Sequence, residues 1–405
     1  MNAAPFTGGR TLMTRAAIVG VAGLAATAAG AAMDPRRALY AYLAAFVYWS
    51  GIAAAAMVFL MANEAANAKW YIVVRRLLEA LPTAFTVLAV LFLPIALFAG
   101  RIFPWVDPTA AGHAALQPWA HGEGKLAIHL WEHRHPWMNL PFFLVRAVVY
   151  FLVWLGVAAA MRRWSLAQDA SGAPELKLKM RRLGAGGLPF VALAITFAAF
   201  DWQMSLSAFL FSTIFGVYWF AGSLVAAIAM LILAAAAASK EEPLRSAINP
   251  NHVHSLGKYL FAFTAFWAYI AFSQYLLIWI ANLPEEVPWY LVRTDSGWKG
   301  VGIFLMLFQF VLPFVILIPR ERKRRWKPLV FMSIWILAVH YVDVYWVIMP
   351  GISPAGPSPS WMDLAAFAGI GGIAVAWVVS RLRGHAILPA RDPYLSESLH
   401  YEPQQ

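Results

Sequence analysis

The sequence predicts an all-α integral membrane protein with about ten transmembrane helices. Of its 405 residues, 61% are hydrophobic and only 13% are charged, and the mean hydropathy is +0.63. Soluble domains carry about 25% charged residues. Ten apolar runs also reach the roughly 20 residues that a bilayer core requires. They lie at about 15–33, 38–62, 77–100, 139–161, 188–207, 209–238, 257–283, 298–318, 328–349 and 361–381.

These runs predict one polytopic membrane domain with short loops and no sizeable soluble domain. The first run is rich in Ala and Gly and follows Arg10 and Arg15, so it resembles a signal peptide, but we expect an uncleaved first span. Most of the 31 Lys and Arg residues lie in loops on the N-terminal side of the membrane, as in the stretch 320–327. The positive-inside rule therefore predicts that both termini and the 382–405 tail are cytoplasmic. The longest loop, 101–138, is then periplasmic.

Composition also limits the chemistry of the chain. The net charge of +11 is concentrated beside apolar runs, which fits membrane topology and anionic lipid better than nucleic acid. The chain has no cysteine, which excludes a disulfide, a thiolate nucleophile and a cysteine-held iron–sulfur cluster in this chain. Its 19 Trp and 14 Tyr residues suit interfacial belts.

Prolines and glycines mark special positions within the spans. Pro82 and Pro94 interrupt the third span and Pro313 the eighth, and each frees backbone carbonyls to bind a side chain or water. Gly216 and Gly222 in the sixth span favour close helix approach.

Polar side chains inside apolar spans are the candidate functional residues, because an ionisable group in hydrocarbon costs about 3 kcal/mol unless it is partnered or wetted. His340 and Asp343 lie three residues apart in the ninth run, on one helix face. Seven polar positions are predicted at a similar depth on the outer side, and two acids lie on the inner side. The full candidate set is Asp201, His340, Asp343, Gln274, Ser273, Arg146 and Asp363 in the outer half, with Glu64 and Glu79 in the inner half.

Asp201, His340 and Asp343 could form a proton-exchanging cluster that faces a quinone-sized pocket. Quinol oxidation releases protons, and a carboxylate or imidazole near the ring hydroxyl is their natural acceptor. The alternative is a buried polar network that only ties helices together. Both interpretations stay open from the residues alone.

Two further patterns have a functional and a structural interpretation. The loop segment HGEGKLAIHLWEHRHPW contains His121, His129, His133 and His135, with Glu123 or Glu132 as the acid that would complete a metal site. Without an HExxH motif, a subunit-contacting loop is favoured over a metal site. Phe266, Tyr269 and Ser273 fall on one helical stripe that could stack on a quinone, although such stripes usually serve helix packing.

Several segments resemble a known family. AFDWQMSLSAFLFSTIFGVYWFAGSLVAAI, KYLFAFTAFWAYIAFSQYLLIWIANLPEE, HYVDVYWVIMP and the PFFLVRAVVYFLVW pattern near 139–154 are similar to the smaller NrfD-like membrane subunit of bacterial alternative complex III. The resemblance covers roughly residues 77–350.

The resemblance implies a fold, partners and a location. The fold is ten helices, eight of them in two four-helix bundles, with two further helices. The complex is a quinol:cytochrome c, or other periplasmic acceptor, oxidoreductase of the bacterial inner membrane. The implied partners are a larger NrfD-like subunit, an iron–sulfur subunit, c-type cytochrome subunits and a terminal oxidase. Haem c and iron–sulfur clusters then belong to those partners, and quinone or quinol is the ligand to expect here, with none bound covalently.

The implied role of the smaller subunit is a quinone site or a proton pathway. Asp201, His340 and Asp343 match polar positions of the family pattern, whereas Glu64 and Glu79 match no motif. The expected role is a subunit that is not catalytic alone. The alternatives are a purely structural anchor of the complex and, from another class, an ion-coupled secondary transporter that uses Asp201 and Asp343.

Overall fold

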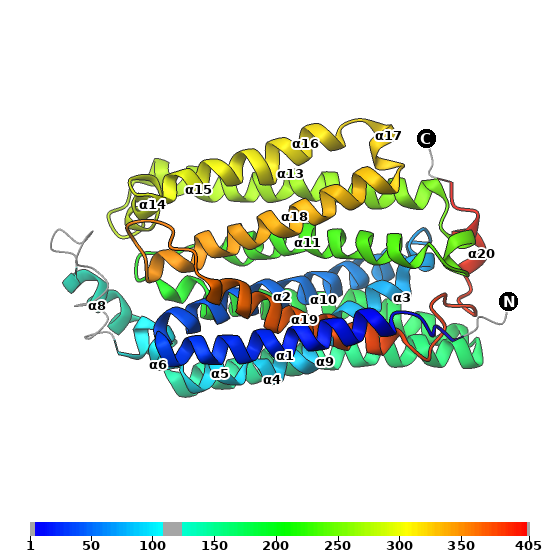
Figure 1. Cartoon of the computed structure of the whole chain (residues 1–405), viewed down its shortest axis with the longest axis horizontal. Coiled ribbons are helices and arrows are strands. Elements are labelled where there is room, and N and C mark those ends of the chain that lie inside the picture. Colours follow the sequence, from blue (N-terminus) through cyan, green and yellow to red (C-terminus); the bar gives the residue numbers. More distant parts are fainter. Residues whose placement is uncertain (1–4, 108–123, 403–405) are drawn as a thin grey trace.

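The computed structural model describes residues 5–107 and 124–402, and within them the chain is a bundle of long helices (Figure 1). Ten helical segments are long and apolar enough to cross a membrane, which confirms the predicted all-α membrane class. The spans are Arg10–Met33, Pro35–Ala65, Ile72–Leu97, Leu140–Ser171, Pro174–Leu206, Phe215–Ala238, Pro250–Ala281, Trp298–Leu317, Trp326–Gly351 and Trp361–Leu382.

Most spans are single helices. These are α1 (Arg10–Met33), α2 (Pro35–Ala65), α9 (Leu140–Ser171), α10 (Pro174–Trp202), α11 (Phe215–Ala238), α13 (Pro250–Ala281), α18 (Trp326–Ile348) and α19 (Trp361–Leu382). Short elements connect them: α6 (Ala99–Ile102), η2 (Pro104–Val106), α8 (Gly124–His133), η3 (Met204–Leu206), α12 (Leu244–Ala247), α14 (Val287–Thr294), α17 (Arg320–Lys323), η5 (Met349–Gly351) and α20 (Leu395–Leu399).

The third and eighth spans are broken where the prolines predict. The third runs through α3 (Ile72–Ala80), the 3₁₀ turn η1 (Leu81–Ala84), α4 (Phe85–Leu91) and α5 (Leu93–Leu97). The eighth runs through α15 (Trp298–Leu305), the π-helical segment η4 (Met306–Val311) and α16 (Leu312–Leu317). The indole N–H of Trp335 donates to the Phe308 carbonyl at 2.8 Å, so a side chain does bind a carbonyl in the irregular turn.

The bundle has two distinct ends (Figure 1). The end where α1 begins, α19 ends and α17 and α20 lie is here called the terminal end, and the end with α8 and α14 is called the loop end. Helix α2 lies in the centre, since 89% of its most apolar window is buried, and it packs against α10, α11 and α19. Its many alanines permit these close contacts, because a small side chain lets a neighbouring backbone approach.

Two features of the chain differ from what hydropathy predicts. The helix of the fifth span begins at Pro174, well before residue 188, because its first turns carry charged side chains yet remain helical. The segment after α19 also folds back over the terminal end: the Phe6 N–H donates to the His385 carbonyl at 2.9 Å, and the Ser398 hydroxyl donates to the Trp70 carbonyl at 3.3 Å. Residues 383–402 therefore form a strap across the ends of several helices.

Candidate functional site

A buried imidazole, carboxylate and phenol meet in the loop-end half of the bundle. His340 Nδ1 lies 3.4 Å from Asp343 Oδ2, and the Tyr218 hydroxyl donates to the other carboxylate oxygen of Asp343. His340 and Asp343 are 1% and 2% exposed. Helix α18 brings the two groups together because residues three apart share a face, and α11 supplies Tyr218. We call His340, Asp343 and Tyr218 the His–Asp cluster.

The pocket of the His340 ring is shaped by a glycine and a tyrosine. A Cβ at position 222 would lie 2.7 Å from His340 Cε1, so only glycine admits the imidazole here. The Tyr48 ring lies beside it at 5.4 Å between centroids. Neither ring nitrogen of His340 has a hydrogen-bond partner among the described residues. A buried polar atom without a partner is expected to bind water or to serve a functional role.

Asp201 lies in a different interaction. Its two carboxylate oxygens accept hydrogen bonds from Arg146 Nε at 2.9 Å and from Arg146 Nη2 at 2.7 Å, and Tyr150 donates at 2.7 Å. Arg146 also donates to the Trp137 carbonyl at 2.8 Å. Within the described chain, no hydrogen bond or ion pair joins Asp201 to His340 or Asp343. The three groups predicted as one cluster thus have two separate sets of partners.

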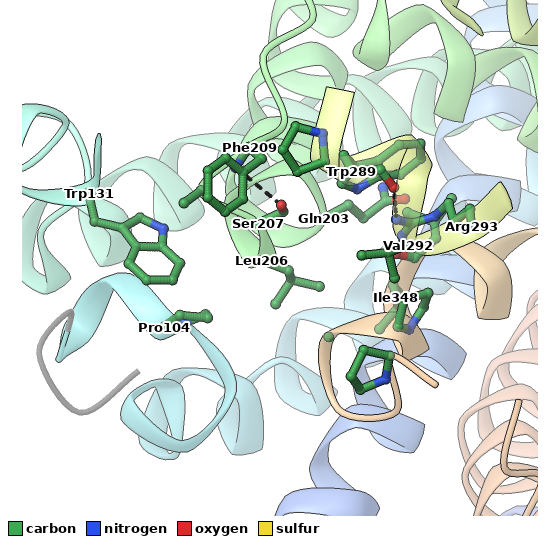
Figure 2. Close-up of a pocket in the computed structure, with 16 residues that line it drawn as sticks. Pro104, Trp131, Gln203, Leu206, Ser207, Phe209, Trp289, Val292, Arg293 and Ile348 are labelled. Carbon is green, nitrogen blue, oxygen red and sulfur yellow. Dashed lines mark hydrogen bonds between the residues drawn. The ribbon is translucent and has the colours of Figure 1, made fainter. Parts of the chain in front are cut away.

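A cavity of about 100 Å³ lies at the loop end of the bundle (Figure 2). Val347, one helical turn beyond Asp343, is part of its wall. Gln203 and Arg293 also line it, and Gln203 Nε2 is buried without a partner among the described residues. Because a water molecule needs about 10–15 Å³ of such volume, the cavity can hold several waters.

Arg293 is fixed in the wall of this cavity. It donates to the Trp289 carbonyl at 2.7 Å and to the Val347 carbonyl at 2.8 Å, and its guanidinium stacks on the Trp289 ring at 3.5 Å. Burial lowers the pKa of Arg293 to about 9, which still leaves it charged at neutral pH. Burial likewise raises the pKa of Tyr290 to about 12. A fixed positive charge therefore lies beside the cavity.

The remaining loop-end candidates are bound locally. Gln274 accepts from the Ser212 hydroxyl at 3.2 Å and donates to the Tyr290 hydroxyl at 3.3 Å, while the neighbouring Ser273 is half-buried. Asp363 is paired with Arg37, whose Nη1 donates at 2.8 Å, and it also caps the start of α19. Asp363 therefore joins the first turns of α2 and α19.

Glu64 and Glu79 lie in a buried charge cluster at the terminal end. Lys177 Nζ is 2.9 Å from Glu64 Oε1, and Arg75 Nε is 3.0 Å from Glu79 Oε1. Asp392, from the strap, pairs with Arg75 and lies 3.3 Å from Lys177. The members of this charge cluster are Glu64, Arg75, Arg76, Glu79, Asp169, Lys177 and Asp392.

The charge cluster ties distant parts of the chain together. Tyr71 donates to Glu64, and burial together with that carboxylate raises the pKa of Tyr71 well above its ordinary value, so the phenol stays a donor. Asp392 of the strap is connected to Glu64 through Lys177 and to Glu79 through Arg75, and the two acids are only 1% and 3% exposed. Both acids are thus closed off rather than open at the surface.

The loop histidines and the aromatic stripe lie on the outside of the bundle. His129 and His133 are exposed on α8, with ring centroids 6.5 Å apart, whereas His121 and Glu123 lie outside the described residues. No group of three or more His, Asp or Glu side chains in the described ranges is placed to hold a metal ion. Tyr269 is 66% exposed, whereas Phe266 and Ser273 are partly buried, so the predicted stripe lies at the edge of the bundle.

Sequence reasoning did not identify several partners of the candidate residues. Tyr218 was hidden in an aromatic-rich run, and Arg75, Lys177 and Asp392 looked like ordinary loop or tail charges. Lys177 and Asp392 are 215 positions apart in the numbering, so spacing gives no signal of their contact. The one available signal was Arg146, a basic residue inside an apolar span, which needs an acid nearby.

Comparison with models of protein families and with curated proteins finds no match to this chain.

Proposed function

We propose that this chain is the smaller NrfD-like membrane subunit of a bacterial quinol:cytochrome c, or other periplasmic acceptor, oxidoreductase, and that its His–Asp cluster conducts protons. The four segments quoted from residues 77–350 support the first part, because their residues and their order along the chain are similar to those of that subunit. The larger NrfD-like subunit, the iron–sulfur subunit, the c-type cytochromes and a terminal oxidase are the proposed partners. In this proposal they hold the haem c and the iron–sulfur clusters.

The observation that carries the proton role is the buried His–Asp cluster, whose helix α18 continues into the wall of a cavity that Gln203 and Arg293 also line. An imidazole whose ring nitrogens have no hydrogen-bond partner among the described residues can accept and release a proton. Asp343 can stabilise the imidazolium, and Tyr218 supplies a further exchangeable proton to the same carboxylate. Waters in the cavity lined by Gln203 and Arg293 would continue the route toward the loop end.

The size of that cavity favours protons over a quinone ring. A cavity of about 150 Å³ is what a benzene molecule occupies in a protein interior, and this one is about 100 Å³. The cavity lined by Gln203 and Arg293 is therefore large enough for water molecules but smaller than the space that a benzene-sized ring occupies.

The distribution of basic residues supports a location and orientation. Arg75, Arg76 and Lys177 lie at the terminal end, as do the basic residues of α17. By the positive-inside rule, the terminal end faces the cytoplasm of a bacterium and the loop end faces the periplasm. The His–Asp cluster would then exchange protons with the periplasmic side.

A structural anchor is the second candidate, and specific contacts favour it. Asp201, Asp363 and Glu64 are engaged in ion pairs that join different helices. Glu79 is paired within α3 and accepts a hydrogen bond from the Ser165 hydroxyl of α9 at 2.6 Å. Under this alternative, the His–Asp cluster would only add one more contact between α11 and α18.

The test has two steps. Mild-detergent purification of the chain from native membranes, followed by mass spectrometry and a reduced-minus-oxidised haem spectrum, should reveal c-type haem and a large iron–sulfur protein. A solitary, colourless chain would exclude the respiratory complex and bring the transporter alternative forward.

The second step uses the purified complex in sealed vesicles. Asp343→Asn should lower the protons moved per electron with assembly and electron transfer retained, and Tyr218→Phe should do so more weakly. Asp295→Asn, at an exposed loop-end position, is the matched control. Unchanged coupling in an intact Asp343→Asn complex would leave only the anchor role.

A further inference from the structure

A second cavity, of about 300 Å³, lies in the terminal-end half between α1, α2, η1, α11 and α19. All of its lining side chains are apolar, and Trp49 presents only its ring, because its N–H donates to the Phe367 carbonyl at 3.0 Å. Along α19 the wall runs from Ala374 to Leu382, which is about 12 Å at 1.5 Å per residue. This is an elongated apolar space about 12 Å deep.

Close helix packing keeps this space open. A Cβ on Gly23 would lie 2.5 Å from the Gly369 backbone nitrogen, so α1 is fixed directly against the backbone of α19. Helix α1 therefore cannot move closer to α19 to fill the gap. Small side chains on the wall, Ala234 and Ala374 among them, leave the volume unfilled.

The mouth of the cavity opens beside basic residues. Leu12 and Ala237, both exposed, lie at the edge of the lining. Arg15 is exposed one helical turn from Leu12, and Arg381 is exposed next to Leu382, the last lining residue of α19. The edge of the apolar lining thus lies next to two exposed basic residues in the sequence of α1 and α19.

We propose that an acyl chain of an anionic glycerophospholipid occupies this cavity, with its phosphate near Arg15 and Arg381. Apolar cavities stay dry, and an empty one forfeits dispersion contacts along its whole wall, so hydrocarbon from the adjoining leaflet fills it. Basic residues near a membrane surface attract anionic lipid. A quinone ring is disfavoured because the lining offers it no polar side chain. This inference does not depend on the proposed function.

The test is photolabelling of the full chain in phosphatidylcholine vesicles that contain a fraction of phosphatidylglycerol. The phosphatidylglycerol carries a diazirine at the end of its acyl chain. Mass spectrometry should place label on Leu81 and Ala374, at the wall of the cavity. Unlabelled phosphatidylglycerol should compete better than phosphatidylcholine, and Arg15→Gln with Arg381→Gln should remove that preference.

A cavity-filling variant provides the second measurement. Ala234→Phe with Ala374→Leu should abolish wall labelling, whereas Ala192→Phe on an exposed, outward-facing position should leave it unchanged. Label confined to outward-facing residues such as Leu152, or wall label that persists in the filled variant, would overturn the site. Equal competition by the two lipids would overturn the headgroup assignment, and a co-purified quinone that displaces the label would overturn the phospholipid assignment. The wild-type arms decide the question even where a filled variant fails to fold.

Discussion

Replacing Asp201 by Asn tests whether its carboxylate stabilises the fold or carries protons. The change keeps the shape of the side chain and an acceptor for the Tyr150 hydroxyl, but it removes the charge that Arg146 meets at 2.7 and 2.9 Å. Arg146 would keep the Trp137 carbonyl as its remaining acceptor. Breaking a buried ion pair by removing one partner costs about 3–5 kcal/mol. The free energy of unfolding should fall by about that amount.

The assay is thermal unfolding of the purified chain in detergent, followed by proton coupling in the assembled complex. Arg146→Met with Asp201→Leu should regain most of the stability, because neither partner is then left as an uncompensated buried charge. Protons moved per electron should stay normal in complexes that assemble with Asp201→Asn. The reasoning is refuted if stability is unchanged while coupling is lost, since Asp201 would then belong to the proton route.

Three further predictions concern how the helices and the strap are held. Asp392→Asn should destabilise the strap by about 1.5–3 kcal/mol, the usual range for hydrogen bonds to charged groups, and limited trypsin digestion should then release the tail faster than in the wild type. Burial and the nearby cations Arg162, Arg76 and Arg381 lower the pKa of His385 below its ordinary 6.5. The contribution of neutral His385 to the stability of the strap is therefore complete above about pH 6.5 and is lost as the pH falls. Proteolysis of the strap should rise with acidification, and His385→Gln should weaken that dependence. Gly372→Val would place a side chain 2.5 Å from the Gly20 nitrogen. Cross-linking between cysteines introduced into α1 and α19 should therefore decline. The outward-facing Gly156→Val variant is the control and should cross-link normally.

The spans could be predicted because hydrocarbon imposes a length and a composition on any helix that crosses it. The breaks at Pro82, Pro94 and Pro313 were predictable for an equally local reason, namely the missing backbone N–H of proline. The start of α10 was not, because hydropathy marks where a helix enters the membrane rather than where its hydrogen bonding begins. Lys177 shows this: it lies inside the helix but outside the apolar run.

The candidate site was predictable as a set of residues but not as a set of contacts. His340 and Asp343 are neighbours by helix geometry, so their meeting follows from spacing alone. Whether Asp201 joins them depends on the packing of α9, α10 and α18, which no local pattern specifies. Arg146 and Asp201 pair because α9 and α10 are adjacent in space. The position of a residue along its span can be estimated from the sequence, but its position around the bundle cannot.

The strap has a consequence for the order in which the protein is made. Arg75 and Lys177 leave the ribosome 317 and 215 residues before Asp392, which both of them contact. Until then the growing chain carries buried cations that lack part of their counter-charge. Completion of the fold at the terminal end thus waits for the synthesis of Asp392, and a chain terminated before that residue would expose a defect that membrane proteases can recognise.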